Sequence, residues 1–253
     1  MDVKITKKKG EKLEFILDGV KPDFANSLRR AIMSEVPVLA VDWIEVHENN
    51  SALFDEIIAH RLGMIPLSFD PKKFNFQDQC KCEGKGCPLC QVVFALEKTG
   101  PCVVYSGDMK SSNPEVKPLS PKFPIVELLK GQKIKLEAVA RLGTGREHAK
   151  YQAAIASYQY YPEIKKLEKG EKLEKCPDGI VSMKGNKPVI PDPVKLDITK
   201  PCQIGDYKIV LNENKFIFRV ESVSGLSPDY IVKKAVEILT EKASEFKEKI
   251  KNI

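Results

Sequence analysis

The alternation of apolar and polar residues predicts a strand hairpin and then a helix at the start of the chain. Residues 3–17 alternate on both sides of a turn near Lys9–Gly10, as in a β-hairpin with one buried face. Between Pro22 and Pro37, apolar residues recur every three or four positions, which indicates an amphipathic helix. Asp23 can cap the start of this helix, and Pro37 ends it because the residue before a proline avoids the α conformation.

The middle of the chain has patterns typical of short strands. A brief helix is expected near Phe54 to Leu62, and Gly63 is placed to end it in the left-handed conformation. The strands are expected at Leu39–Val46, Gln91–Leu96, Cys102–Tyr105, Ile125–Leu129 and Lys133–Leu142.

The last third begins with a change in composition. Residues 163–206 are rich in proline, glycine and lysine and show little periodicity, so they predict a loop-rich inserted subdomain. Two strands follow, Tyr207–Leu211 and Lys215–Val220, joined by a hairpin turn at Asn212–Asn214. A long helix with Ser227 as cap and Pro228 as first residue ends the chain, and its apolar residues track one face as far as Ile250.

These elements predict an α+β protein in which both chain ends form one domain. Residues 1–47 and 207–253 would make this discontinuous domain, residues 48–162 a β-rich domain inserted into it, and residues 163–206 a second insertion. A chain of 253 residues is long enough for two or three domains.

Composition and charge restrict the class of protein. The apolar share of 42% and the charged share of 30% are typical of a soluble globular chain. No run of eighteen apolar residues and no secretory signal is present, so no membrane contact is expected. Seven cysteines, four of them clustered, fit the reducing cytoplasm. The net charge of +6 permits contact with nucleic acid but does not argue for it.

The strongest chemical signal is a loop with four cysteines, Cys80, Cys82, Cys87 and Cys90. Their C-x-C-x4-C-x2-C spacing can close a tetrahedral shell of four thiolates around one metal ion. Zinc is the expected metal, and an iron–sulfur cluster or no retained metal are the alternatives. A closed shell leaves no open coordination position, so the metal would be structural.

The remaining cysteines give a weaker signal. Cys176 and Cys202 are either free buried thiols or close enough for a disulfide, and the base rate in the cytoplasm favours the reduced form. Two cysteines alone cannot hold an iron–sulfur cluster. Cys102 lies in an apolar strand and is expected to be a small core residue.

No set of catalytic residues is recognisable. The three histidines lie apart in the sequence, and neither a nucleophile elbow nor a phosphate-binding loop is present. Arg146, His148 and Lys150 cluster in the turn LGTGREHAK, which is either a solvated turn or a surface that docks on an acidic protein. Aromatic residues do not interleave with the basic ones, so sequence-specific contact with nucleic acid is not expected.

Four stretches together resemble one protein family. Residues 24–37 (FANSLRRAIMSEVP), 55–67 (DEIIAHRLGMIPL), 131–162 (GQKIKLEAVARLGTGREHAKYQAAIASYQYYP) and 215–239 are similar to the α-like subunits of cellular RNA polymerases. The archaeal branch of that family is the best match, and its members are the counterparts of the bacterial α N-terminal domain. The loop of four cysteines resembles the zinc loop of the archaeal and eukaryotic branch.

The resemblance implies a non-catalytic assembly platform within DNA-directed RNA polymerase. The domain formed by both chain ends would pair with the small subunit L, and subunits N and P would complete the subassembly. The residues expected to meet subunit L are Phe24, Leu28, Ile32, Val36, Ile231, Ala235, Ile238 and Phe246. The residues expected to dock on the second-largest, catalytic subunit are Arg29, Arg30, His60, Arg61, Arg146, His148 and Lys150.

One departure from the family concerns residues 163–206. In some members this insertion is ferredoxin-like and carries an iron–sulfur cluster on four cysteines, three of them in a C-x-x-C-x-x-C run. This chain has only Cys176 and Cys202 there. The resemblance therefore implies a smaller, degenerate ferredoxin-like fold without a cluster. Two rival interpretations remain: a small metal-binding redox protein built around the cysteines, and a stand-alone basic DNA-binding module.

Overall fold

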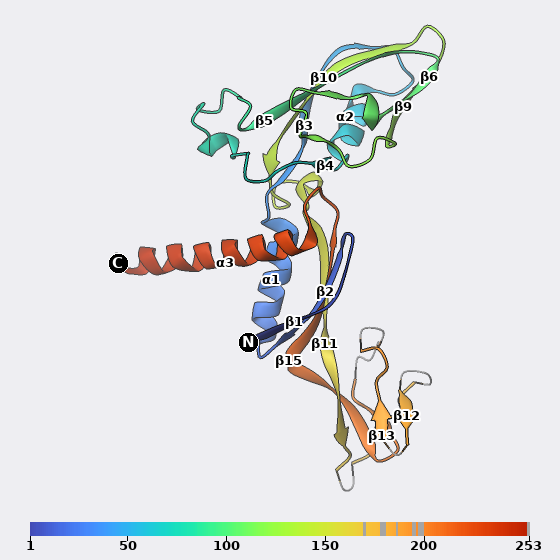
Figure 1. Ribbon diagram of the computed structural model, residues 1–253, viewed down its shortest axis with the longest axis vertical. Helices are drawn as coiled ribbons and strands as arrows, with labels where there is room; N and C mark the ends of the chain where they lie inside the picture. Colours follow the sequence, from blue (N-terminus) through green and yellow to red (C-terminus); the bar gives the residue numbers. More distant parts are fainter. Residues whose placement is uncertain (169–170, 178–180, 186, 194–195, 197–199, 252–253) are drawn as a thin grey trace. The chain divides into compact units, whose positions relative to one another are not determined.

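The structure is a computed structural model that describes residues 1–168, 171–177, 181–185, 187–193, 196 and 200–251 (Figure 1). The expected subdomain of residues 163–206 therefore lies partly outside the described residues. The chain has a mixed α/β fold in which most regular elements are strands. Among the described residues, no helix is both long enough and apolar enough to span a membrane.

The chain divides into two compact units, and each contains two separate stretches of sequence. Unit 1 comprises residues 1–29 and 156–220, and unit 2 comprises residues 30–155 and 221–253. These limits differ from the domain borders expected from the sequence, at residues 47/48, 162/163 and 206/207, which stay a prediction. The last helix is thus grouped with unit 2, and the N-terminal hairpin with unit 1.

Unit 1 is built around an antiparallel sheet whose strand order is β1-β2-β15-β11, with β14 paired to β15. The predicted N-terminal hairpin is confirmed, because β1 pairs with β2 around a turn at Gly10. An aromatic cluster fills one face of the sheet: the rings of Phe15 and Phe218 stack 5.0 Å apart, and Tyr158 contacts Phe216 and Phe218. The strands are β1 (Asp2–Lys9), β2 (Lys12–Asp18), β11 (Ala154–Lys166), β14 (Cys202–Ile204) and β15 (Tyr207–Ser222), and a separate pair is β12 (Ser182–Lys184) with β13 (Lys187–Val189).

The predicted turn at Asn212–Asn214 is wrong, because β15 continues through it. The polar groups of this stretch find partners without a turn. The Asn212 side chain donates to Glu163 on β11 at 2.7 Å, and the backbone carbonyl of Asn214 accepts from the amide of Gly19 at 2.9 Å. A polar triplet that these neighbours satisfy can stay extended, although its composition is typical of turns.

Unit 2 contains a sheet of strand order β3-β10-β5-β7 and two short strand pairs, β4-β8 and β6-β9. Ile134, Leu136 and Ala138 alternate along β10 toward the buried face, which confirms that predicted strand. The strands are β3 (Val38–Asn49), β4 (Leu67–Ser68), β5 (Gln91–Thr99), β6 (Cys102–Tyr105), β7 (Lys110–Ser111), β8 (Lys117–Pro118), β9 (Pro124–Leu128) and β10 (Lys133–Gly143). Single turns of 3₁₀-helix are η1 (Gln77–Gln79), η2 (Ser106–Asp108) and η3 (Ala149–Tyr151).

The three predicted helices are present. In α1 (Pro22–Ser34), the Asp23 carboxylate accepts the amide of Phe24 at 2.8 Å and so satisfies one N–H of the first turn. The helix α2 (Asp55–Gly63) includes Gly63 as its last helical residue, and Met64 after it is right-handed, so the predicted left-handed glycine is wrong. The helix α3 (Pro228–Lys251) begins at the predicted proline.

Candidate metal centre and subunit-binding surfaces

The four-cysteine loop lies between η1 and β5 in unit 2, and its backbone is tightly folded. Cys80, Cys82 and Cys87 each accept a backbone hydrogen bond from a residue three positions later, at 2.9–3.1 Å. Such consecutive turns need left-handed residues, and Gly84 and Gly86 have φ values of 79° and 84°. The glycines that separate the cysteines therefore allow all four thiols to point inward.

The sulfur atoms are spaced as a single four-coordinate ion requires. The Sγ atoms of Cys80 and Cys87 are 3.5 Å apart, those of Cys82 and Cys90 3.6 Å, and those of Cys87 and Cys90 3.8 Å. All four lie within 4.8 Å of one another. A tetrahedral ion with metal–sulfur bonds of about 2.3 Å separates its ligand sulfurs by about 3.8 Å, so these residues fit one zinc-sized ion. In a cubane cluster each ligand sulfur binds a different iron, which would hold the sulfurs farther apart.

The thiols of Cys82 and Cys90 differ in acidity. Burial raises the pKa of the Cys90 thiol to about 12. At Cys82, burial has the same tendency, but hydrogen bonds with the thiols of Cys80, Cys90 and Cys87 outweigh it and lower the pKa to about 7. Because a metal binds thiolates, ligation must displace the protons from the less acidic thiols, and metal affinity should increase with pH.

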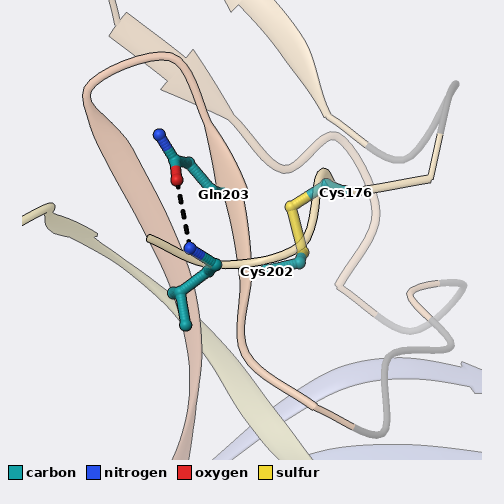
Figure 2. The surroundings of a disulfide bond; sticks show 4 residues. Cys176, Cys202 and Gln203 are labelled. Atoms are coloured by element: carbon teal, nitrogen blue, oxygen red, sulfur yellow. Dashed lines mark hydrogen bonds between the residues drawn. A yellow bond between two sulfur atoms is a disulfide. The ribbon is translucent and has the colours of Figure 1, made fainter. Parts of the chain in front are cut away.

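Cys176 and Cys202 form a disulfide, which corrects the expectation of a reduced pair (Figure 2). Backbone hydrogen bonds hold residues 173–176 beside β14: Gln203 accepts from the amide of Cys176 at 3.0 Å and donates to Glu174 at 2.8 Å. The Gln203 side chain also accepts from the amide of Leu173. These bonds bring the two Cα atoms to 4.9 Å, a normal separation for a disulfide.

The other cysteines of the chain are free thiols. Cys102 is half-buried at the start of β6, where its thiol donates to the carbonyl of Thr99, so it is not the core residue expected from its apolar strand.

The eight residues expected to meet a small partner protein differ in exposure. Phe24 and Phe246 are exposed, and Ile238 is half-buried. The other five are buried within the chain itself, namely Leu28, Ile32, Val36, Ile231 and Ala235. Their apolar character is thus explained by this chain's own core.

A different apolar stripe runs along α3 from Val236 to Ile250, and most of it is exposed. Val236, Phe246 and Ile250 are 43%, 66% and 51% exposed. With Leu239 and Ala243 they are spaced three and four residues apart, so they share one helix face. Every residue from Thr240 to Lys251 is exposed. Sequence reasoning missed Val236, although its spacing to Phe246 and Ile250 was visible.

The turn that carries Arg146, His148 and Lys150 is held by a partly buried carboxylate. Asp42 accepts hydrogen bonds from Lys150 at 2.7 Å, from Arg141 at 2.7 Å and from the Tyr151 hydroxyl at 2.9 Å. Burial alone would raise the pKa of Asp42, but these hydrogen bonds and the two positive charges outweigh it and lower the pKa. The Lys150 ammonium is largely buried on Asp42, so this residue supports the turn and is not part of an exposed basic cluster.

Arg146 and His148 remain exposed at the surface of the same turn. The amide of Arg146 donates to the carbonyl of Ser34 at 3.1 Å, and its guanidinium lies 3.7 Å from Glu35, just after α1. A Cβ atom at Gly145 would lie 2.5 Å from the carbonyl oxygen of Met33, so only glycine permits this approach. The end of α1, which carries exposed Arg30, and this turn therefore form one surface.

A cavity of about 220 Å³ joins this turn to the segment after α2. Met64, Ile65 and Pro66 line it together with Ala149 and Lys150. The two stretches expected to dock, AHRLGMIPL and GREHAK, are thus adjacent in unit 2.

The other three residues expected to dock are His60 and Arg61 on α2 and Arg29 on α1. His60 and Arg61 are both exposed on α2, and the Arg61 guanidinium donates to the carbonyl of Ile125 at 2.7 Å. Arg29 lies in unit 1, where it donates to the side chain of Asn26 at 2.9 Å.

Comparison with known proteins shows full-length relatives. Residues 44–162 match the family described as the RNA polymerase Rpb3/RpoA insert domain. The chain is 41% identical to the DNA-directed RNA polymerase subunit Rpo3 of Archaeoglobus fulgidus, over 100% of this chain and 98% of that protein. The chain belongs to the archaeal Rpo3 family of RNA polymerase subunits. Rpo3 of Pyrococcus horikoshii is 42% identical over 96% of this chain and 95% of its own length.

Membership in the Rpo3 family bears out the resemblance to α-like subunits. Rpo3 of Methanothermobacter thermautotrophicus is 38% identical over 97% of both chains, so the similarity covers both units and both chain ends. This favours a polymerase subunit over the small redox protein and the stand-alone DNA-binding module.

Proposed function

We propose that this chain is a non-catalytic assembly subunit of an archaeal DNA-directed RNA polymerase, acting in the cytoplasm as half of a heterodimer with the small subunit L. The two chain ends (residues 1–47 and 207–253) would form the dimerisation domain, with residues 48–162 and 163–206 as insertions. The proposal rests on membership in the Rpo3 family and, above all, on the exposed stripe of α3.

The stripe argues for a partner protein because the second half of α3 is exposed on all sides, and a helical segment of that length is barely stable without packing. An isolated helix of about 12 residues is marginal in water, and most helices gain stability by burying an apolar face. Val236, Leu239, Ala243, Phe246 and Ile250 offer such a face at the spacing of a helix-packing seam. Subunit L would cover this face, together with exposed Phe24 of α1.

The four-cysteine loop would hold a structural zinc ion. The spacing of the sulfur atoms supports zinc, and the loop has few apolar residues with which to fold by itself. In the 163–206 insertion the disulfide uses both cysteines, so we propose that this degenerate ferredoxin-like part carries no iron–sulfur cluster.

The surface formed by the end of α1 and the turn at residues 143–151 would dock on the second-largest subunit. It presents Arg30, Arg146 and His148, and its cavity could seat an apolar side chain between Met64 and Ala149. Arg29, His60 and Arg61 would extend the contact, and subunits N and P would join the same subassembly. Lys150 would act indirectly, by holding the turn on Asp42.

Co-purification tests the heterodimer. Tagged full-length chain, expressed with subunit L, should retain L in a one-to-one ratio. Phe246→Glu should remove L, because it places a charge in an apolar contact. Ser244→Glu is the matched control, since Ser244 is exposed on the same helix outside the stripe, and it should retain L. Equal retention by all three proteins would contradict the proposed face.

A second variant separates docking from pairing. Arg30→Ala combined with Arg146→Ala should retain subunit L but recover less of the second-largest subunit. Loss of L from this variant would show that the two surfaces are not separate.

A further inference from the structure

The N-terminal strand β1 has the pattern of a half-buried strand. Val3 and Ile5 alternate with Asp2 and Lys4, and such alternation is typical of a strand with one covered face. In the hairpin, Val3 lies opposite Leu17 and Ile5 lies opposite Phe15. Directly opposite residues of an antiparallel pair point to the same face, so Val3 and Ile5 belong to the core face of the sheet.

On that face the residues of β2 are buried, but those of β1 are not. Phe15 and Leu17 are 3% and 2% exposed, whereas Val3 and Ile5 are 59% and 60% exposed. Val3 and Ile5 thus extend the apolar face of the unit 1 sheet past the side chains of unit 1 that cover it. Phe24, also exposed, lies in unit 1 six residues after the end of β2.

The charges on β1 indicate what kind of surface would cover these residues. The strand carries Lys4, Lys7, Lys8 and Lys9 against a single acidic residue, Asp2. Lys8 lies opposite Leu13, on the same face as Ile5. A binding partner should therefore combine an apolar stripe with acidic side chains at the end near Lys8.

We infer that Val3 and Ile5 of β1 form part of the heterodimer interface and are covered by an apolar helix face of the small partner protein that is flanked by acidic residues. This inference rests on the proposed heterodimer, and it adds a sheet surface to the helical contacts proposed above. The lysines of the strand would also discourage pairing of this sheet edge with other chains until the partner arrives.

Binding measurements with subunit L test the inference, using the full-length chain. The variant Val3→Glu with Ile5→Glu should weaken binding at least tenfold, while its thermal unfolding stays close to that of the wild type because both side chains are exposed. Leu129→Glu is the control: Leu129 is 61% exposed in unit 2, and its replacement should leave the affinity unchanged.

Hydrogen exchange of the wild-type chain provides a second readout that needs no variant. Amides of residues 2–9 should exchange at least tenfold more slowly in the complex with L than in the free chain. Unchanged exchange there, or wild-type affinity of the double variant while Phe246→Glu loses L, would overturn this inference and leave the heterodimer intact. A wild-type chain that ignores L would overturn both. Loss of self-association in the double variant, with binding to L unchanged, would assign the face to a second copy instead.

Discussion

The two halves of α3 carry apolar residues at the same helical spacing but meet different surroundings. In the first half, Ile231 and Ala235 are fully buried within the chain. In the second half, Phe246 and Ile250 are exposed, on a helix whose last twelve described residues, Thr240 to Lys251, are all exposed. One helix therefore serves two purposes: its first half stabilises this chain, and its second half is available to another.

This difference changes how an apolar stripe should be interpreted. Periodicity shows that a helix has an apolar face, but it does not show whether the same chain or a partner covers it. Substitutions in the two halves should separate effects on stability from effects on binding.

Ile231→Ala should destabilise the folded chain by about 2–5 kcal/mol, because it leaves a cavity at a fully buried position. Chemical denaturation of the purified chain measures this. A change below about 0.5 kcal/mol would show that the first half of α3 is not part of the core.

Removal of the metal should unfold the four-cysteine loop while leaving α3 unchanged. A chelator, or Cys82→Ser, would remove the metal ligation that we propose holds residues 80–90 together. Hydrogen exchange should accelerate in that loop and stay constant in residues 228–251. Because binding displaces thiol protons, loss of metal should require less chelator as the pH falls, and the opposite trend would contradict thiolate ligation.

Loss of the disulfide should have a smaller and more local effect. Replacing Cys176 and Cys202 by serine removes a cross-link between residues 26 positions apart, for which about 2–4 kcal/mol is typical. The loss should appear as faster exchange in residues 173–176 and 202–204, with affinity for subunit L unchanged. Weaker binding of L would show that this segment contributes to the interface.

Phe246→Ala should change the free energy of unfolding by less than about 0.5 kcal/mol, because the side chain is exposed in the free chain. Comparing this change in the free energy of unfolding with that of Ile231→Ala tests most directly whether only the first half of α3 belongs to the core. A loss comparable to that of Ile231→Ala would mean that this chain already covers Phe246.

Local patterns were sufficient to predict much of the fold. The hairpin, the three helices and the strand of residues 133–142 follow from periodicity, prolines and capping residues. The four-cysteine loop was also visible, because its ligands lie within eleven residues of one another. In each case the residues whose interactions determine the local structure lie close together in the sequence.

Features set by distant residues could not be predicted in the same way. Lys150 reaches Asp42 across 108 positions, so an apparently exposed basic residue is buried. The hydrogen bonds of Gln203 bring Cys176 to Cys202. Glu163 on β11 and Gly19, just after β2, keep Asn212–Asn214 extended. Similarly, five residues expected to meet the partner proved to be core residues, because spacing alone does not reveal what covers a face.

The most direct test of the central claim is amide hydrogen exchange of residues 240–251, measured in the free chain and with saturating subunit L. The proposed heterodimer predicts fast exchange in the free chain, where this half of the helix is exposed, and strong protection once L is bound. If L binds and exchange in residues 240–251 stays as fast as in the free chain, the exposed stripe of α3 is not the partner surface.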